Sequence, residues 1–396
     1  MNTAPDVIVA GAGPAGSVAA LQLARAGRQV LLLDRSEFPR DKTCGDGLIA
    51  DSIGALTTLG LADEVVSRSY CTSRLLVVAP AGTEVRFETA FWVLPRMVLD
   101  DLLFTKAREA GATFRRLIVD GPLRDGARVV GVVAREPKSD TAIELRAPLT
   151  LLATGAASGI LRKFDPGARN EASGYAVRTY AERPAGPVSE LMISLDRELL
   201  PGYAWAFPEP GGLINVGIGT LSSRRLREDG VNLRQRLDQL LGGGGSLGRI
   251  LGPLRPTQPY QGAPLRTGLL GATLHQPGLA IIGEAAGTTY ALTGEGIGKA
   301  MESGMLAAEL ASAPGAVPAD IGPRYAETMA ARYASRFATY EIAQRWMRFP
   351  WVADLVARRA NRSEWLHDRL TGILTERALP THVFSARTLW RLLTQG

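Results

Sequence analysis

The chain has 396 residues, of which 46% are hydrophobic and 21% are charged, which is ordinary for a folded globular protein and excludes wholesale disorder. Its length predicts two lobes rather than one continuous core. The net charge of +6 is spread along the chain without a run of five like charges, so we expect no nucleic-acid partner.

The first predicted unit is a β-α-β arrangement. Val7–Ala10 is an unbroken apolar run and predicts a buried strand. Ser17–Ala26 is rich in Ala and Leu, predicts a packed helix, and is followed by a glycine. Gln29–Leu33 predicts a second strand, which ends at Asp34 with Arg35 beside it. This order indicates parallel strands in an α/β domain.

The turn between the first strand and the helix reads Gly11-Ala12-Gly13-Pro14-Ala15-Gly16. Gly11 permits a tight turn, Gly13 lets the backbone approach a pyrophosphate, and Gly16 allows the helix and strand to pack closely. Pro14 fits the first helical turn, and the free N–H groups at that helix end favour a diphosphate. An acid at Asp34 accepts hydrogen bonds from ribose hydroxyls. The sequence therefore predicts a dinucleotide site, but this motif alone does not distinguish FAD from NAD.

Further along the chain, Ser52–Val66 and Pro95–Gly111 predict helices, and the second is clearly amphipathic. Val129–Ala134 predicts a strand. The apolar runs Leu149–Ala153 and Leu279–Ile282 predict two more core strands, the first of them in the parallel sheet.

The second half of the chain changes character. Residues 174–219 read as strands with interleaved aromatic residues, which predicts an antiparallel sheet in a substrate lobe. A helical tail follows Arg324, and its aromatic and apolar residues from Trp346 to Ile373 form either a core or an interaction face.

Two cysteines are too few for a disulfide framework, and the apolar stretch at the N-terminus leads into glycines as a strand does. No apolar run approaches the roughly 18 residues that span a bilayer. We therefore expect a cytoplasmic protein and leave peripheral membrane contact open. The three histidines lie outside every motif and no metal-ligand cluster is present, so a cofactor must carry the chemistry.

Three segments together resemble the geranylgeranyl reductase branch of the aromatic-hydroxylase-like flavoproteins. They are Phe38–Gly47, the helix that begins near Arg96, and Gly283-Glu284-Ala285-Ala286-Gly287. In that family a Gly-Asp-Ala-Ala-Gly segment holds the flavin, and here Glu284 replaces its Asp. Thr293-Gly294-Glu295-Gly296-Ile297 matches the continuation that lies against the flavin ring. Thr154 replaces the Asp of an Asp-Gly segment that serves flavin and pyridine nucleotide in the hydroxylases.

The resemblance implies an α/β fold with a discontinuous Rossmann-type FAD-binding domain, an antiparallel-sheet substrate domain and a helical C-terminal region. We assign residues 1–70, 95–172 and 260–315 to the first, 71–94 and 173–259 to the second, and 316–396 to the third. The predicted FAD contacts are Gly11, Gly13, Pro14, Ala15, Gly16, Asp34, Arg35, Arg40, Cys44, Gly45, Arg96, Gly155, Gly283, Glu284, Gly294, Gly296 and Ile297.

The family's substrate-lobe signature also has a counterpart. Tyr203-Ala204-Trp205-Ala206-Phe207-Pro208 is followed by Gly217-Ile218-Gly219. Alternate strand positions share one face, so Tyr203, Trp205 and Phe207 predict either an aromatic substrate wall or core packing. We predict Tyr203, Trp205, Phe207, Pro208, Gly217 and Gly219 as substrate-binding residues.

Cys44 is the candidate catalytic residue, because the matching cysteine of archaeal members is implicated in reduction. It is either a proton donor to the substrate or a small buried side chain.

The leading interpretation is a reductase that saturates carbon–carbon double bonds of a prenyl chain on a lipid or quinone. A flavin-dependent monooxygenase or oxidase is the nearest alternative, and a flavoprotein that docks on and modifies another protein is a third. NAD(P)H, bound transiently, or another reductant would supply the electrons, since no second dinucleotide motif is present.

Overall fold

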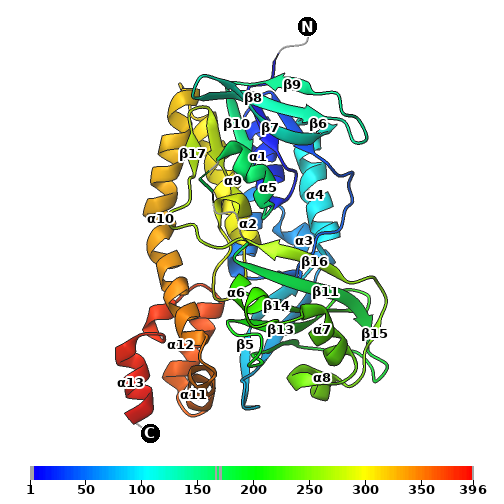
Figure 1. The fold of residues 1–396 in the computed structure, drawn as a ribbon, viewed down its shortest axis with the longest axis vertical. Coiled ribbons are helices and arrows are strands. Elements are labelled where there is room, and N and C mark those ends of the chain that lie inside the picture. Colours follow the sequence, from blue (N-terminus) through cyan, green and yellow to red (C-terminus); the bar gives the residue numbers. More distant parts are fainter. Residues whose placement is uncertain (1–3, 166, 169–171, 395–396) are drawn as a thin grey trace.

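The computed structural model describes residues 4–165, 167–168 and 172–394. The chain forms an elongated molecule (Figure 1), with the parallel sheet and its helices at one end and the largest sheet at the other. The long helix α10 (Pro318–Met347) runs down one side and leads to the C-terminal helices. The predicted domain ranges also include residues 1–3, 166, 169–171 and 395–396, which lie outside the described part.

The first sheet has the strand order β17-β18-β10-β1-β2-β6, and every pair is parallel except β17 with β18. Its strands are β1 (Val7–Ala10), β2 (Val30–Asp34), β6 (Thr113–Arg116), β10 (Leu149–Leu152), β17 (His275–Gln276) and β18 (Leu279–Ile281). The predictions of strands at Val7–Ala10, Leu149–Ala153 and Leu279–Ile282 are confirmed. Their apolar runs are buried within the largest hydrophobic core, as expected for a parallel sheet that is covered on both faces.

The helices beside this sheet are α1 (Pro14–Arg25), α4 (Arg96–Glu109) and α9 (Ile297–Ser312), and α1 packs on both of the others. Helix α1 begins three residues before the predicted start, because Pro14 occupies its first turn. The single helix predicted over Ser52–Val66 is wrong. Two helices, α2 (Ala50–Leu59) and α3 (Ala62–Arg68), are separated at Gly60, whose φ of 73° ends the first.

The largest sheet has the order β15-β11-β14-β13-β12-β4-β5-β3, with β16 also paired to β11. It is antiparallel as predicted except for one parallel pair, β12 with β4. Its strands are β3 (Gly47–Leu48), β4 (Tyr70–Val78), β5 (Glu84–Val93), β11 (Gly174–Glu182), β12 (Leu191–Ser194), β13 (Gly202–Pro208), β14 (Ile214–Thr220), β15 (Arg255–Pro256) and β16 (Gln261–Leu265). Strands β3 and β16 come from ranges that we assigned to the cofactor domain.

A third, three-stranded sheet contains β7 (Ile118–Asp125), β8 (Arg128–Arg135) and β9 (Ile143–Arg146), and includes the strand predicted at Val129–Ala134. Short helices complete this half of the chain: α5 (Ser158–Phe164), α6 (Ser223–Arg227), α7 (Leu233–Leu241), α8 (Gly245–Leu251) and the 3-10 turn η1 (Gly283–Ala286). Helices α7 and α8 cover the outer face of the large sheet.

The C-terminal helices form a hydrophobic core with the other side of β4 and β5. They are α11 (Pro350–Ala360), α12 (Glu364–Leu374) and α13 (Ala386–Thr394), with the 3-10 turn η2 (Pro380–His382) before the last. Val352 and Leu366 are fully buried in this core, whereas Trp351, Trp365 and Trp390 are about half exposed or more. The tail is therefore both a structural wall and an aromatic outer surface.

Candidate active site

Two adjoining cavities lie between the parallel sheet, the large sheet and the C-terminal helices. The first has a volume of about 540 Å³ and extends from the glycine turn after β1 to the aromatic residues of β13. The second has about 260 Å³ and is enclosed by β4, β5 and the C-terminal helices. The residues that line both mark their junction: Cys44, Gly45, Tyr203, Phe207, Gly294, Gly296 and Ile297.

The glycine turn fits the first cavity closely. A Cβ atom on Gly16 would lie 1.8 Å from the carbonyl oxygen of Gly11, and one on Gly11 would lie 2.3 Å from the carbonyl oxygen of Ala153. At Gly13 a Cβ would meet only the Arg40 guanidinium, at 3.6 Å, so this backbone faces open space. Gly11, Gly13, Pro14 and Ala15 line the cavity, and Gly16 packs behind it.

Asp34 and Arg35 line the cavity at the end of β2. The Asp34 carboxylate accepts hydrogen bonds from the backbone N–H groups of Ala12 and Ser36, each at 2.9 Å. These bonds fix the carboxylate at the mouth of the glycine turn, and each of its oxygens has a further lone pair for a ligand hydroxyl.

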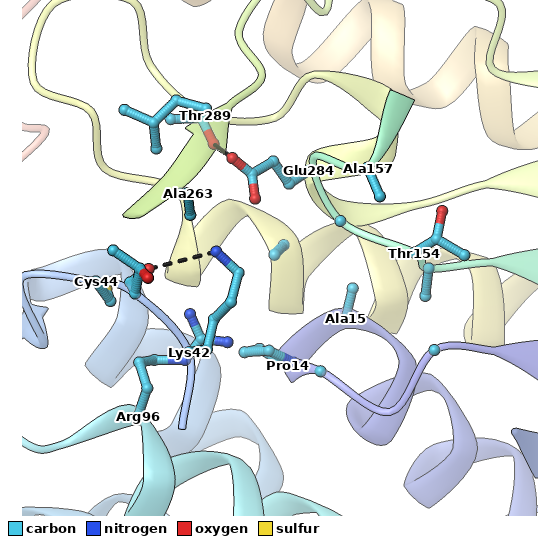
Figure 2. Close-up of a pocket in the computed structure, with 18 of the residues that line it drawn as sticks. Pro14, Ala15, Lys42, Cys44, Arg96, Thr154, Ala157, Ala263, Glu284 and Thr289 are labelled. Atoms are coloured by element: carbon cyan, nitrogen blue, oxygen red, sulfur yellow. Dashed lines mark hydrogen bonds between the residues drawn. The ribbon is translucent and has the colours of Figure 1, made fainter. Parts of the chain in front are cut away.

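Cationic side chains line the opposite wall (Figure 2). Arg96 is buried at the start of α4 and donates two hydrogen bonds to Asp100, of 2.6 and 2.8 Å, and Arg40 lies 3.1 Å from the same carboxylate. Burial opposes the charge of Arg96, but Asp100 outweighs burial and raises the pKa of the guanidinium. Lys42 projects into the cavity, and its amine donates to the carbonyl of Thr43 at 3.3 Å. This cationic wall suits an anionic ligand such as a diphosphate.

Polar groups from three later segments face this wall across the cavity (Figure 2). Glu284 accepts a hydrogen bond from the Arg266 backbone at 3.2 Å and from Thr289 at 3.5 Å. Gly155 and Thr154 lie beside it, and the buried Thr154 hydroxyl has no hydrogen-bond partner within the described residues. Gly283 packs against Ala15 and does not line the cavity, because its Cβ would lie 2.7 Å from that of Ala15.

These features test whether the cavity suits FAD. The glycine turn leaves backbone N–H groups free at a helix start, the opposite wall is cationic, and Asp34 has lone pairs free for ribose hydroxyls. All three suit a long ligand with a diphosphate and ribose hydroxyls. The residues therefore fit FAD. Lys42 and Thr289 also line this cavity but are absent from the predicted FAD contacts, although Lys42 lies inside the Phe38–Gly47 segment that carries the resemblance.

Strand β13 presents Tyr203, Trp205 and Phe207 to the first cavity, as its alternation predicts. The Tyr203 hydroxyl donates a hydrogen bond to the carbonyl oxygen of Thr293, and the Trp205 indole N–H donates to Asn215 at 2.9 Å. Gly219 also lines the cavity. Among the remaining predicted substrate residues, Gly217 lies under the Trp205 ring, where a Cβ would be 2.1 Å from it, and Pro208 lines neither cavity.

Cys44 lies at the junction of the cavities (Figure 2), on the loop before β3. Burial, together with the nearby negative charge of Asp46, raises the pKa of the thiol. Cys44 therefore stays protonated at neutral pH, and its position beside both cavities is compatible with contact to a substrate.

A buried polar cluster lies directly behind Cys44. Asp46 accepts hydrogen bonds from the Tyr180 hydroxyl at 2.5 Å and from the Asn215 amide at 2.7 Å, and the same amide also donates to the Cys44 carbonyl. Arg178 is fully buried, with its guanidinium 4.4 Å from the centre of the Tyr180 ring. The cluster fixes the Cys44 loop against β11 and β14. Sequence analysis did not reveal this cluster, because its members come from three separate segments.

Glu209 at the end of β13 joins this cluster, and no donor reaches either of its buried carboxyl oxygens within the described residues. Burial and the charge of Asp46 raise the pKa of Glu209. A carboxyl whose pKa is raised on folding stabilises the fold most below its unfolded pKa of about 4.3, and that contribution is lost as pH rises.

We therefore predict that Glu209→Gln removes a pH-dependent penalty. The melting temperature of the variant, relative to that of the natural protein, should increase steadily between pH 5 and about pH 9. Thermal unfolding followed by circular dichroism at several pH values checks this, with the exposed Glu364→Gln as control. A difference that does not change with pH would contradict it.

The second cavity is lined mainly by apolar side chains, with Asp46, Asp51 and Glu295 among its few polar residues, and was not predicted from the sequence. Its walls come from β4, β5 and β12 on one side and the C-terminal helices on the other. Representative lining residues are Leu75, Val77, Phe87, Phe91, Ile193, Met347, Ala353, Val356, Ile373 and Phe384. An apolar cavity of this kind, open to the cofactor site at Cys44, suits an apolar substrate.

Comparisons with known proteins agree with this geometry. Residues 4–177 match the family described as FAD binding domain. The chain is 34% identical over 334 residues to menaquinone reductase of Mycolicibacterium smegmatis, covering 80% of this chain and 78% of the relative. It is 32% identical over 322 residues to digeranylgeranylglycerophospholipid reductase 1 of Methanopyrus kandleri, covering 77% and 80%.

Among solved structures, a geranylgeranyl bacteriochlorophyll reductase-like protein from Thermoplasma acidophilum has a TM-score of 0.75 at 21% identity, covering 99% of this chain and 96% of that one. A flavin-dependent brominase has a TM-score of 0.72 at 19% identity, covering 99% and 98%. These two likenesses concern the fold alone.

The fold and the first cavity define a flavoprotein, an FAD-dependent oxidoreductase. Within that class, the chain belongs to the geranylgeranyl reductase family.

Proposed function

We propose that this protein saturates carbon–carbon double bonds in the isoprenoid chain of a lipid or quinone. The apolar second cavity, which opens onto the cofactor site at Cys44, is the observation that supports this most strongly. Two relatives are named for the reduction of menaquinone and of a digeranylgeranyl lipid, and both molecules carry an isoprenoid chain.

The predicted FAD contacts that line the first cavity would hold the cofactor there, with Gly16 and Gly283 packed behind them, and FAD, once reduced, would supply hydride. The protein's own residues then bind the isoprenoid chain between the large sheet and the C-terminal helices and exclude water from the double bond. Tyr203 and Phe207 line both cavities and would orient the chain at their junction. The roles of these residues and of Cys44 are part of the proposal.

The test is anaerobic reduction of the FAD-loaded protein with dithionite, followed by geranylgeraniol in detergent micelles. Reoxidation of the flavin without oxygen, with a product two hydrogens heavier, supports the proposal. Reoxidation by oxygen alone would contradict it and would favour the monooxygenase. NAD(P)H in place of dithionite tests whether a nicotinamide is the physiological donor.

We also propose that the C-terminal helices contact an anionic membrane surface, from which such a substrate would be taken. Within the described residues, no helix is both long and apolar enough to cross a bilayer. The tail exposes Phe349, Trp351, Trp365 and Trp390, with exposed fractions between 44% and 67%. Between residues 345 and 394, exposed arginines outnumber exposed acids: Arg345, Arg348, Arg358, Arg362, Arg369, Arg377, Arg387 and Arg391 against Glu364 and Asp368. Aromatic rings with arginines are suited to the headgroup region of anionic bilayers.

We predict that the protein sediments with phosphatidylglycerol vesicles at low salt and much less with phosphatidylcholine vesicles. The double variant Trp365→Ala with Trp390→Ala should weaken this association because it removes two exposed rings, whereas Ile250→Ala on α8 should not. Equal sedimentation with both lipids would contradict the proposal. If the double variant stays monodisperse and the natural protein captures another protein instead of lipid, the docking alternative would be favoured.

A further inference from the structure

Glu295 lies in the loop before α9, where the two cavities meet. The glycines on both sides of it, Gly294 and Gly296, line both cavities, and Glu295 itself lines the apolar one. The loop is held in place: the Tyr290 N–H donates to the Glu295 carbonyl at 2.8 Å, and a Cβ on Gly296 would lie 2.6 Å from the Thr289 hydroxyl. The backbone of Glu295 is thus held in place, and the residue lines an apolar cavity beside the cofactor site.

The charges behind Glu295 are unbalanced. Lys299 is 3.5 Å from Asp51 and 2.9 Å from both Glu302 and Glu376, so three carboxylates share one buried amine. Arg336, from α10, lies 4.0 Å from Glu376 and is the second cation of the group. Among the described residues Glu295 itself forms no ion pair.

Protonation follows from this arrangement. Burial raises the pKa of Glu295 well above its ordinary value, and the charges of Asp51 and Glu376 raise it further, while Lys299 opposes them. The tyrosines that face it from β13 and α10, Tyr203 and Tyr340, are themselves neutral at pH 7, because burial raises their pKa values. Burial and these charges therefore favour the protonated form of Glu295, in a residue that lines the cavity proposed for the substrate.

We propose that Glu295 is the acid that protonates one carbon of the substrate double bond. This rests on the proposed function. The π bond breaks, Glu295 gives its proton to the less substituted carbon, and the tertiary carbon receives hydride from the reduced flavin. Two C–H bonds form, the flavin is oxidised by two electrons, and Glu295 is left as a carboxylate. Water then reprotonates Glu295, and the two-electron donor that reduces the flavin again restores the hydride.

Chemistry favours Glu295 over Cys44 for this step. A trisubstituted isoprenoid alkene is electron-rich and accepts a proton more readily than an isolated hydride, so the stronger acid has the advantage. A thiol has an ordinary pKa of about 8.5 and a carboxyl about 4.3, so the carboxyl starts as the stronger acid. Burial raises the pKa of both Cys44 and Glu295 from these ordinary values. Cys44 as the donor is the competing outcome of the test.

The experiment compares Glu295→Gln, Glu295→Asp and Cys44→Ser in the FAD-loaded protein, with the exposed Glu309→Gln on α9 as matched control. The first readout is independent of turnover. Infrared difference spectra between neutral and alkaline pH should show the carbonyl stretch of a buried protonated acid in the natural protein and in Cys44→Ser. Glu209, whose pKa burial also raises, contributes to the same band, so the band should lose intensity in Glu295→Gln and keep the part that Glu209→Gln removes.

The second readout is the rate of anaerobic single-turnover reduction of geranylgeraniol across pH. Loss of a general acid typically costs about 10²–10⁴-fold, so Glu295→Gln should slow the step by at least about 100-fold, with partial rescue by Glu295→Asp. Unchanged FAD absorbance in each variant shows that the cofactor site is intact.

The outcomes separate the two proposals. If the natural protein and Glu295→Gln reduce the alkene equally well, the role of Glu295 is overturned and the proposed function stands. Loss of the step in Cys44→Ser with a normal rate in Glu295→Gln would assign the proton to Cys44. Natural protein that never saturates the alkene would overturn both proposals.

Discussion

Gly16→Ala should yield a folded protein that has lost its FAD. The added Cβ would stand 1.8 Å from the Gly11 carbonyl oxygen and 3.2 Å from the Ala153 side chain, so helix α1 must move away from β1. Overpacking of this kind costs about 1–3 kcal/mol even where side chains can adjust, and here the nearest atom is backbone. Because α1 presents its N-terminus to the diphosphate, we expect FAD affinity to fall by about 100-fold or more.

The measurement is the FAD content of the purified variant, with its affinity determined by titration of the apoprotein. Gly54→Ala in α2 is the control, because a Cβ there meets nothing within 4 Å and alanine favours a helix interior. Far-UV circular dichroism shows whether the variant keeps its fold. A folded Gly16→Ala protein with full FAD content would refute the role that we give to this contact.

The cofactor half of the site is predictable from sequence because its information is local. A strand, a glycine turn and a helix occupy adjacent residues, and the geometry of that unit leaves little choice about where Gly13 and Asp34 lie. Gly16 and Gly283 were predicted as FAD contacts but do not line the cavity. Glycine is needed at both positions for close packing, and a motif does not distinguish a glycine needed for packing from one that contacts the ligand.

The second cavity could not be predicted in the same way. Phe87, Ile193 and Ala353 read as core residues from their periodicity, and an apolar residue that faces a cavity has the same pattern as one that faces another side chain. Their meeting depends on the C-terminal helices packing on β4 and β5, a contact between segments more than 250 residues apart.

The buried acids were missed for a related reason. Asp46 and Glu209 stand next to glycine and proline in the sequence, where acids usually face solvent. They are buried only because β11, β13 and β14 bring Arg178, Tyr180 and Asn215 over the Cys44 loop. Separation in sequence, rather than any weakness of the individual contacts, hides such clusters.

Ala353→Phe should block long isoprenoid substrates while leaving the cofactor site intact. Ala353 is buried in α11 and lines the apolar cavity at a distance along the chain from every predicted FAD contact. A phenyl group there would fill space that the distal part of the substrate needs. If it excludes about 100 Å² of apolar contact, about 2.5 kcal/mol of transition-state binding is lost, which is about 70-fold in kcat/KM.

A short prenyl alcohol such as dimethylallyl alcohol needs only the junction near Cys44, so its reduction should be almost unchanged by Ala353→Phe. Comparison of kcat/KM for dimethylallyl alcohol and geranylgeraniol therefore isolates the cavity from the chemistry. The exposed Ala331→Phe on α10 is the matched control. Equal losses for both alcohols would mean that the variant disturbs the reacting centre. No loss for either would mean that the isoprenoid chain lies elsewhere, and the apolar cavity would then no longer support the proposed substrate class.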